Sequence, residues 1–190
     1  TTVCTICLAG KYQDQDNSAT PAVCGDCPTG RYLTDAASAE REHDAEIDCL
    51  FCVKGKQFTS LTTVCTICLA GKYQDQNIAA LATCVDCPAG QYVTDDATSQ
   101  GKHDDPTDCL FCAAGKAFAT ISTACTDCSL GTYQEENAAA LVACSSCEMG
   151  QAASDGSSPC VACVDGQFQA LTPATSYGCK TCDFGQVVAD

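Results

Sequence analysis

The cysteines of this chain all follow one spacing. Its 190 residues include 20 cysteines, and every cysteine belongs to a pair separated by two other residues (CxxC). The ten pairs begin at Cys4, Cys24, Cys49, Cys65, Cys84, Cys109, Cys125, Cys144, Cys160 and Cys179. A chain that repeats one short motif throughout is built of small similar units, each in contact with its neighbours, rather than around one central core.

Each pair is followed by a glycine, three residues after the second cysteine, from Gly10 to Gly185. Glycine adopts positive φ without a steric penalty, so we expect every pair to lead into a tight turn. In eight of the ten copies an aromatic residue follows the glycine by two or three residues, and the other two copies carry Ala152 and Val187. The ring is the largest apolar group available to cover a disulfide in so small a unit.

The apolar content is too low for an ordinary core. Leu, Ile, Val and Phe make up about 17% of the residues, below the level of roughly 20% at which a charged chain becomes suspect for disorder. The overall hydrophobic fraction of 46% includes the alanines and the cysteines. Covalent cross-links must therefore supply the stability that burial does not.

The charge and the hydropathy pattern exclude several classes of partner. Nine basic and 24 acidic residues give a formal net charge of -15, which repels a phosphate backbone and an anionic membrane surface. No apolar run approaches the roughly 20 residues that span a bilayer, and no charged-then-apolar leader begins at Thr1. We expect no nucleic-acid partner, no membrane insertion by this segment, and a chain that is a mature product or a portion of a longer protein.

The repeats form three blocks, residues 1–63, 64–123 and 124–190, which we predict to be the domains. In the third block the second repeat, at Cys144, is nine residues shorter than its equivalents at Cys24 and Cys84, and a further repeat follows. Between the pairs we expect strands of two to four residues, turns and loops. Single helical turns are predicted at 77–81 and 137–141, where an asparagine precedes alanines. The predicted fold is an elongated rod of small disulfide-rich CxxC modules with short β-strands and little helix.

Four kinds of chemistry use CxxC pairs: redox catalysis, zinc binding, iron–sulfur binding and disulfide formation. A redox pair lies at a helix N-terminus, where the dipole lowers a thiol pKa, and ten pairs cannot all do so. Zinc is the stronger rival, because two CxxC pairs about 15 to 20 residues apart have a zinc-ribbon spacing. The cysteine density with so little aliphatic core favours disulfides, and hence an extracellular or cell-surface location. We predict no metal and no cofactor.

Spacing alone leaves the disulfide connectivity open. The simplest scheme is a ladder in which the second cysteine of each pair bonds the first cysteine of the next pair. Its bonds are Cys7 to Cys24, Cys27 to Cys49, Cys52 to Cys65, Cys68 to Cys84, Cys87 to Cys109, Cys112 to Cys125, Cys128 to Cys144, Cys147 to Cys160 and Cys163 to Cys179. The ladder leaves Cys4 and Cys182 for a disulfide between successive copies. The alternative interlocks two pairs, for example Cys4 to Cys24 with Cys7 to Cys27.

Two segments carry a resemblance to known extracellular repeats. They are Cys24-Gly-Asp-Cys-Pro-Thr-Gly-Arg-Tyr32 and Cys84-Val-Asp-Cys-Pro-Ala-Gly-Gln-Tyr92. Both resemble the cysteine-rich repeats of tumour necrosis factor receptors and ephrin-receptor-like repeats. The tandem CxxC pairs, often followed by Pro-Ala-Gly, are more similar to the surface immobilisation antigens of ciliates. The resemblance implies an extracellular disulfide rod, and such repeats serve as receptors, coats and spacers. The receptor module has further cysteines where this chain has none, at 32–48 and 92–108.

The two histidines, His43 and His103, lie in the long acidic loops before Cys49 and Cys109. Carboxylates there suit a divalent ion, but no glycine-spaced ligand pattern supports one, and we expect solvated acidic loops. No Ser-His-Asp or Cys-His set can be assembled, so we predict that the chain is not an enzyme. No N-glycosylation acceptor is present, and the abundant Ser and Thr are compatible with O-linked sugar.

The first hypothesis for function is a structural one. The chain would be a disulfide-laddered repeat unit of a cell-surface coat, appendage or filament, with copies of itself as partners in a head-to-tail assembly. The second is a receptor-like ectodomain that binds a protein ligand, and a remote third is a zinc-ribbon array. Near-identical repeats suit self-packing, whereas a ligand site would make one repeat's exposed loops unlike the others.

Overall fold

The chain forms a ladder of nine disulfides in the computed structural model, which describes residues 3–15, 21–171 and 178–185. Each disulfide joins the second cysteine of one CxxC pair to the first cysteine of the next, with Cα atoms 5.6–5.7 Å apart, within the usual range for disulfides. The interlocked alternative is not the one found. We call the segment closed by each disulfide a module, and modules 1 to 9 span residues 7–24, 27–49, 52–65, 68–84, 87–109, 112–125, 128–144, 147–160 and 163–179.

Every module supplies the first strand of one antiparallel pair of two-residue strands, and the second strand lies just beyond the cysteine that closes the module. The two residues after the glycine pair with the two residues between the cysteines of the next CxxC pair. The pairs are β1(Lys11–Tyr12) with β2(Gly25–Asp26), β3(Arg31–Tyr32) with β4(Leu50–Phe51), β5(Lys56–Gln57) with β6(Thr66–Ile67), β7(Lys72–Tyr73) with β8(Val85–Asp86), β9(Gln91–Tyr92) with β10(Leu110–Phe111), β11(Lys116–Ala117) with β12(Thr126–Asp127), β13(Thr132–Tyr133) with β14(Ser145–Ser146), β15(Gln151–Ala152) with β16(Val161–Ala162) and β17(Gln167–Phe168) with β18(Lys180–Thr181). Such short pairs are not stable alone, and here a disulfide flanks each one. The predicted fold of tandem disulfide-rich repeats with short strands is confirmed.

The glycine turns have the backbone conformation that the sequence predicts. All ten glycines that follow a CxxC pair have φ between +75° and +88°. In this region a Cβ atom meets the backbone, so residues other than glycine are strained there. The turn reverses the chain between the second cysteine of a pair and the strand that follows it.

The helical turns predicted at 77–81 and 137–141 are wrong. Ile78 and Ala138 instead have positive φ, +61° and +59°. The reason is the asparagine before each of them: the Asn77 side-chain oxygen accepts the backbone N–H of Lys54 in the preceding module (3.1 Å), and Asn137 accepts that of Ala114 in the same way (3.0 Å). An asparagine used in this way does not cap a helix of its own.

The helical residues lie in the two long loops, as single 3₁₀ turns. They are η1(Glu40–Glu42) and η2(Glu46–Asp48) in module 2, and η3(Gln100–Lys102) and η4(Pro106–Asp108) in module 5. The Asp48 carboxylate accepts the backbone N–H of Ala45, and the Asp108 carboxylate accepts that of Asp105. Side chains therefore supply the hydrogen bonds that hold the second turn of each loop. No helix in the described part of the chain is long and apolar enough to cross a membrane.

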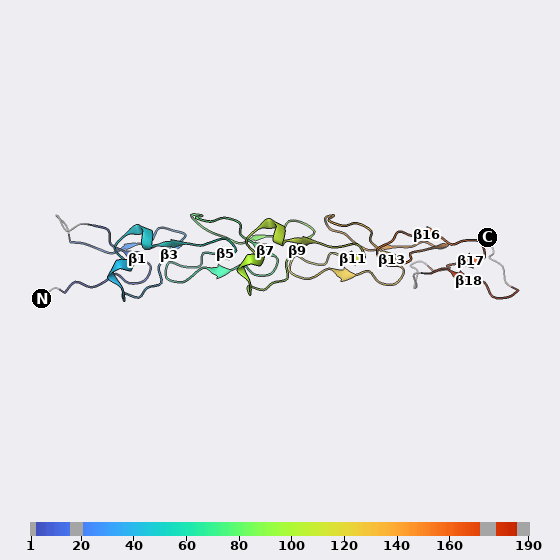
Figure 1. The fold of residues 1–190 in the computed structure, drawn as a ribbon, viewed down its shortest axis with the longest axis horizontal. Helices are drawn as coiled ribbons and strands as arrows, with labels where there is room; N and C mark the ends of the chain where they lie inside the picture. Colours follow the sequence, from blue (N-terminus) through green and yellow to red (C-terminus); the bar gives the residue numbers. More distant parts are fainter. Residues whose placement is uncertain (1–2, 16–20, 172–177, 186–190) are drawn as a thin grey trace. The chain divides into compact units, whose positions relative to one another are not determined.

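The chain divides into two compact units. Unit 1 contains Thr1–Asp86 and Asp95–Asp108, and unit 2 contains Cys87–Thr94 and Cys109–Asp190. In unit 1, blue to green in Figure 1, the buried side chains gather around disulfides: Leu33 lies with Cys27 and Cys49, and Ala82 lies with Cys52 and Cys65. In unit 2, Ala153 is buried with Cys147. Cysteines make up most of the buried apolar residues, so the cross-links also form the core.

Candidate functional site at the contacts between modules

One hydrogen bond recurs between neighbouring modules. The backbone N–H at or just after the aromatic residue donates to a loop carbonyl of the next module, at 2.8–3.0 Å. The pairs are Gln13 to His43, Leu33 to Leu61, Phe58 to Ala82, Gln74 to His103, Val93 to Ile121, Phe118 to Val142 and Gln134 to Gly156. Modules 1 to 7 therefore each extend a strand with this bond to their successors. A second backbone bond, from the turn glycine to the next module, joins modules 1, 3, 6 and 8 to theirs. Nearest-neighbour contacts of this kind stabilise a repeat protein step by step.

The aromatic rings reinforce these contacts. Tyr12 of module 1 packs on the Cys27–Cys49 disulfide of module 2, and Tyr32 packs on the disulfide of module 3. In unit 2, Tyr133 of module 7 packs on the disulfide of module 8. Phe58 is the exception, because it packs on Cys52 and Cys65 of its own module. These rings cover disulfides as the sequence predicts, and the three tyrosines among them cover the next disulfide along the chain.

The two histidines are buried inside these contacts. His43 is 3% exposed and His103 is fully buried. Nδ1 of His43 lies 2.8 Å from the Lys11 carbonyl of module 1, and Nε2 lies 2.9 Å from the Asp35 carboxylate of its own loop. His103 makes the same contacts with Lys72 and Asp95, at 2.7 and 3.1 Å. Each histidine therefore clamps a long loop onto the preceding module.

Both hydrogen-bond partners of His43 are acceptors, which decides its protonation. A carbonyl and an ionised carboxylate carry no proton, so both ring nitrogens must donate, as only the imidazolium does. Burial lowers the pKa of His43, but the bonds to Lys11 and Asp35, together with the charges of Asp35 and Asp48, outweigh it and leave the pKa raised. The hydrogen bond from the Ser38 hydroxyl, helped by His43, holds the pKa of Asp35 far below its usual range.

The expectation of solvated acidic loops is wrong for the two histidines, which are buried against an aspartate further upstream, whereas Asp44 and Glu46 beside His43 are exposed. The side chains of Asp35 and Asp95 are 12% and 9% exposed. Both loops carry an aspartate eight residues before the histidine, with Ser or Thr three residues after that aspartate, and this repeated spacing is the signal that could have indicated the clamp. Within the described residues, no group of three or more His, Cys, Asp or Glu side chains is placed to hold a metal ion.

The cysteines divide into 18 that are bonded and two that are free, Cys4 and Cys182. A sulfur atom in a disulfide is not a thiolate and cannot bind zinc as one. Cys4 is exposed and Cys182 is half-buried. Thr5 and Ile6, between Cys4 and Cys7, lie outside any strand, although the equivalent two residues of the other nine pairs are all paired.

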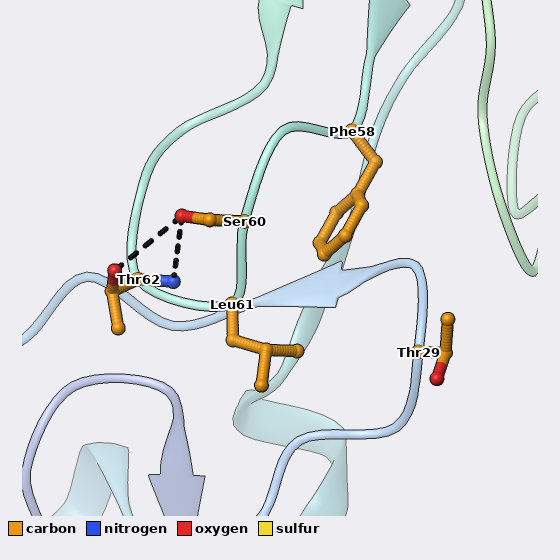
Figure 2. A pocket seen from close by; sticks show the side chains of 5 residues that line it. All are labelled: Thr29, Phe58, Ser60, Leu61 and Thr62. Atoms are coloured by element: carbon orange, nitrogen blue, oxygen red, sulfur yellow. Dashed lines mark hydrogen bonds between the residues drawn. The ribbon is translucent and has the colours of Figure 1, made fainter.

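An open hollow of about 490 Å³ in unit 1 is lined by Thr29, Phe58, Ser60, Leu61 and Thr62 (Figure 2). Figure 2 shows the Phe58 ring and the Leu61 side chain at its apolar side. The Ser60 hydroxyl accepts the backbone N–H of Thr62 at 3.3 Å. None of the five lining residues is charged, and the hollow does not indicate a ligand class.

No protein-family model matches this chain, and no curated protein matches it. The assignment of tandem cysteine-rich repeats therefore depends on the disulfide ladder and not on similarity to a known protein.

Proposed function

We propose that this protein is a structural component of an extracellular coat, appendage or filament. The observation that supports this proposal is the ladder of nine disulfides, in which modules 1 to 7 also bond their successors through a recurring backbone hydrogen bond. Disulfides in this number persist in oxidising extracellular space. A chain whose contacts are made among its own repeats suits a coat or a spacer, which are roles that the resemblance to the surface antigens of ciliates implies.

We further propose that copies join head to tail, along one polypeptide or through a disulfide between chains. Cys182 is the second cysteine of its CxxC pair, as are Cys7 and Cys27, which begin modules. Cys4 is the first cysteine of its pair, as is Cys24, which closes a module. Asp190 followed by Thr1 of another copy would place 12 residues from Cys182 to Cys4, against a separation of 13 in modules 3, 6 and 8. Head-to-tail contacts that do not close into a ring generate filaments.

The proposal includes no catalytic role. Both histidines are held between a carbonyl and a carboxylate, so neither ring nitrogen is available as a base. All cysteines except Cys4 and Cys182 are in disulfides. The remaining polar loops are exposed and are compatible with O-linked sugar.

Peptide mapping of the native material without reduction tests the assembly. A cross-linked peptide that contains Cys4 and Cys182, or a single peptide that runs from Cys182 into the next Cys4, supports the array. Electron microscopy of the same material should show filaments or a layer. A monodisperse monomer with two free thiols that captures one protein ligand would favour the receptor-like alternative. Stoichiometric zinc with many free thiols would contradict both and restore the zinc-ribbon array.

A further inference from the structure

The ten glycine turns differ in what covers them. In the earlier modules the position that a Cβ atom would occupy is filled by backbone. A Cβ on Gly30 would lie 1.5 Å from the Ala80 carbonyl oxygen, and one on Gly90 would lie 2.2 Å from the Leu141 nitrogen. On Gly55 it would lie 2.5 Å from the Gln100 carbonyl oxygen. These contacts are too close for any side chain. Glycine is therefore required here for two reasons: the positive φ and the backbone that covers the turn.

The covering segment always belongs to the second module along the chain. Gly10 of module 1 faces Leu61 and Thr62 of module 3, and Gly30 of module 2 faces module 4. The same step relates Gly55 to module 5, Gly90 to module 7 and Gly115 to module 8. A covered glycine turn is therefore the docking site for a loop two modules ahead, separate from the nearest-neighbour hydrogen bonds.

The last turns have no such cover. Among the described residues nothing lies within 4 Å of the Cβ position of Gly150 or Gly166, and both glycines are exposed, whereas Gly10, Gly30 and Gly90 are buried. Exposed apolar side chains adjoin them: Met149 is 68% exposed and Val164 is 66% exposed. The turns keep the φ of the covered ones, +75° and +80°, so the docking conformation is present without its occupant.

We propose that the Gly150 and Gly166 turns form a docking surface for a second copy of this chain. The inference rests on the head-to-tail assembly proposed above. Each covered turn is covered by the second module after its own. Gly150 lies in module 8, so its cover would be the module that a bond from Cys182 to Cys4 of the second copy closes. Gly166 lies in module 9, so its cover would be module 1 of that copy. The occupant is a copy of this repeat because five glycine turns inside the chain, from Gly10 to Gly115, are covered by a repeat of this same kind.

The chemistry of the surface fits this occupant. In modules 2, 3 and 5 the closest covering atoms are backbone atoms, so a docked loop needs no particular side chain, only a module held at the right spacing by a disulfide. Each copy carries a net charge of -15. Like charges repel across the contact and salt screens that repulsion, so assembly should strengthen as the ionic strength rises.

The test compares an alanine substitution at an uncovered glycine turn with the same substitution at a covered one. Gly166→Ala and Gly150→Ala place a methyl group on the empty surface, Asp165→Asn is the control beside it, and Gly30→Ala is the covered counterpart. Oxidised protein is followed by sedimentation velocity over a range of concentrations. Protease resistance and a count of two free thiols report on the folded monomer.

We expect wild type and Asp165→Asn to assemble alike. Gly166→Ala and Gly150→Ala carry only the strain of a positive φ, so they should lose less protease resistance than Gly30→Ala, which adds a clash with the Ala80 carbonyl, and both should weaken assembly at least tenfold. Assembly of Gly166→Ala and Gly150→Ala at wild-type strength would overturn the docking surface and leave head-to-tail joining intact. Wild type that stays monomeric at every concentration and salt level, without the Cys4–Cys182 bond, would overturn the assembly itself.

Discussion

Modules 2 and 8 present the same hydrogen-bond acceptor to the preceding module by different means. In module 2 the acceptor is the carbonyl of His43, a residue buried by its own two ring contacts, and module 5 uses His103 in the same way. In module 8, whose loop is nine residues shorter, the acceptor is the carbonyl of Gly156. The Asp155 carboxylate holds this shorter loop by accepting the N–H and the hydroxyl of Ser157.

The difference shows which part of the long loop the ladder needs. The bond from Gln134 to Gly156 is as short, at 2.8 Å, as the bond from Gln74 to His103. A short turn is therefore enough to supply the acceptor. Both long loops add a buried histidine–aspartate hydrogen bond, and in module 2 the raised pKa of His43 brings a dependence on protonation that module 8 lacks.

The largest expected effect comes from removing the clamp. His103→Ala removes the bond to the Lys72 carbonyl and one of the donors of the Asp95 carboxylate, which keeps Thr98 and Ser99. An unsatisfied buried acceptor costs about 1–3 kcal/mol, so the protection of the Gln74 amide against hydrogen exchange should fall about tenfold or more. The Gln134 amide of the same molecule, bonded to the short loop of module 8, is the internal control. An equal loss at both amides would mean that the histidine stabilises the whole ladder and not its own loop.

The pH dependence should separate the two kinds of loop next. The pKa of His43 is raised in the folded state, so its contribution is complete below the ordinary value of about 6.5 and is lost as the pH rises through the folded value. The pKa of Asp35 is lowered, so its contribution is complete above about 3.9 and is lost only as the pH falls through its much lower folded value.

Exchange protection of the Gln13 amide should therefore be greatest between roughly pH 4 and 6.5 and decline on the alkaline side. The Gln134 amide, after correction for the intrinsic exchange rate, should show no such decline. A Gln13 protection that stays flat from pH 6 to 9 would mean that the clamp holds without the imidazolium.

The smallest effect distinguishes the two long loops from each other. In module 2 the Arg31 guanidinium lies over the Phe51 ring, 4.2 Å from its centroid, and pairs with Glu46 at 3.0 Å. Module 5 has Gln91 at the place of Arg31. Exposed contacts of this kind contribute about 0.5–1 kcal/mol, so Arg31→Gln should lower the exchange protection of the Phe51 region by about threefold. Gln91→Arg is the reciprocal variant, and no change in either would mean that the contact is energetically neutral.

Several features of the fold could be predicted from local sequence. The glycine turns followed from the recurrence of Gly10 and its equivalents, because positive φ is a requirement of one residue. The ladder was the simplest of the open pairings, since it joins neighbours along the chain. The burial of His43 and the use of Asn77 were missed, because the Lys11 carbonyl lies 32 residues from the histidine and the Lys54 N–H lies 23 residues from the asparagine.

The sequence by itself determined the repeat, the presence of short strands and the positions that favour glycine, because these depend on residues within one or two CxxC pairs. Tertiary structure alone decided that three of the tyrosines cover the next disulfide, that Gly30 is sealed by Ala80, and that Gly166 is left open. Those outcomes depend on which module lies against which. Contact between a module and the second one after it is set by packing in space, and no spacing of cysteines along the chain specifies it.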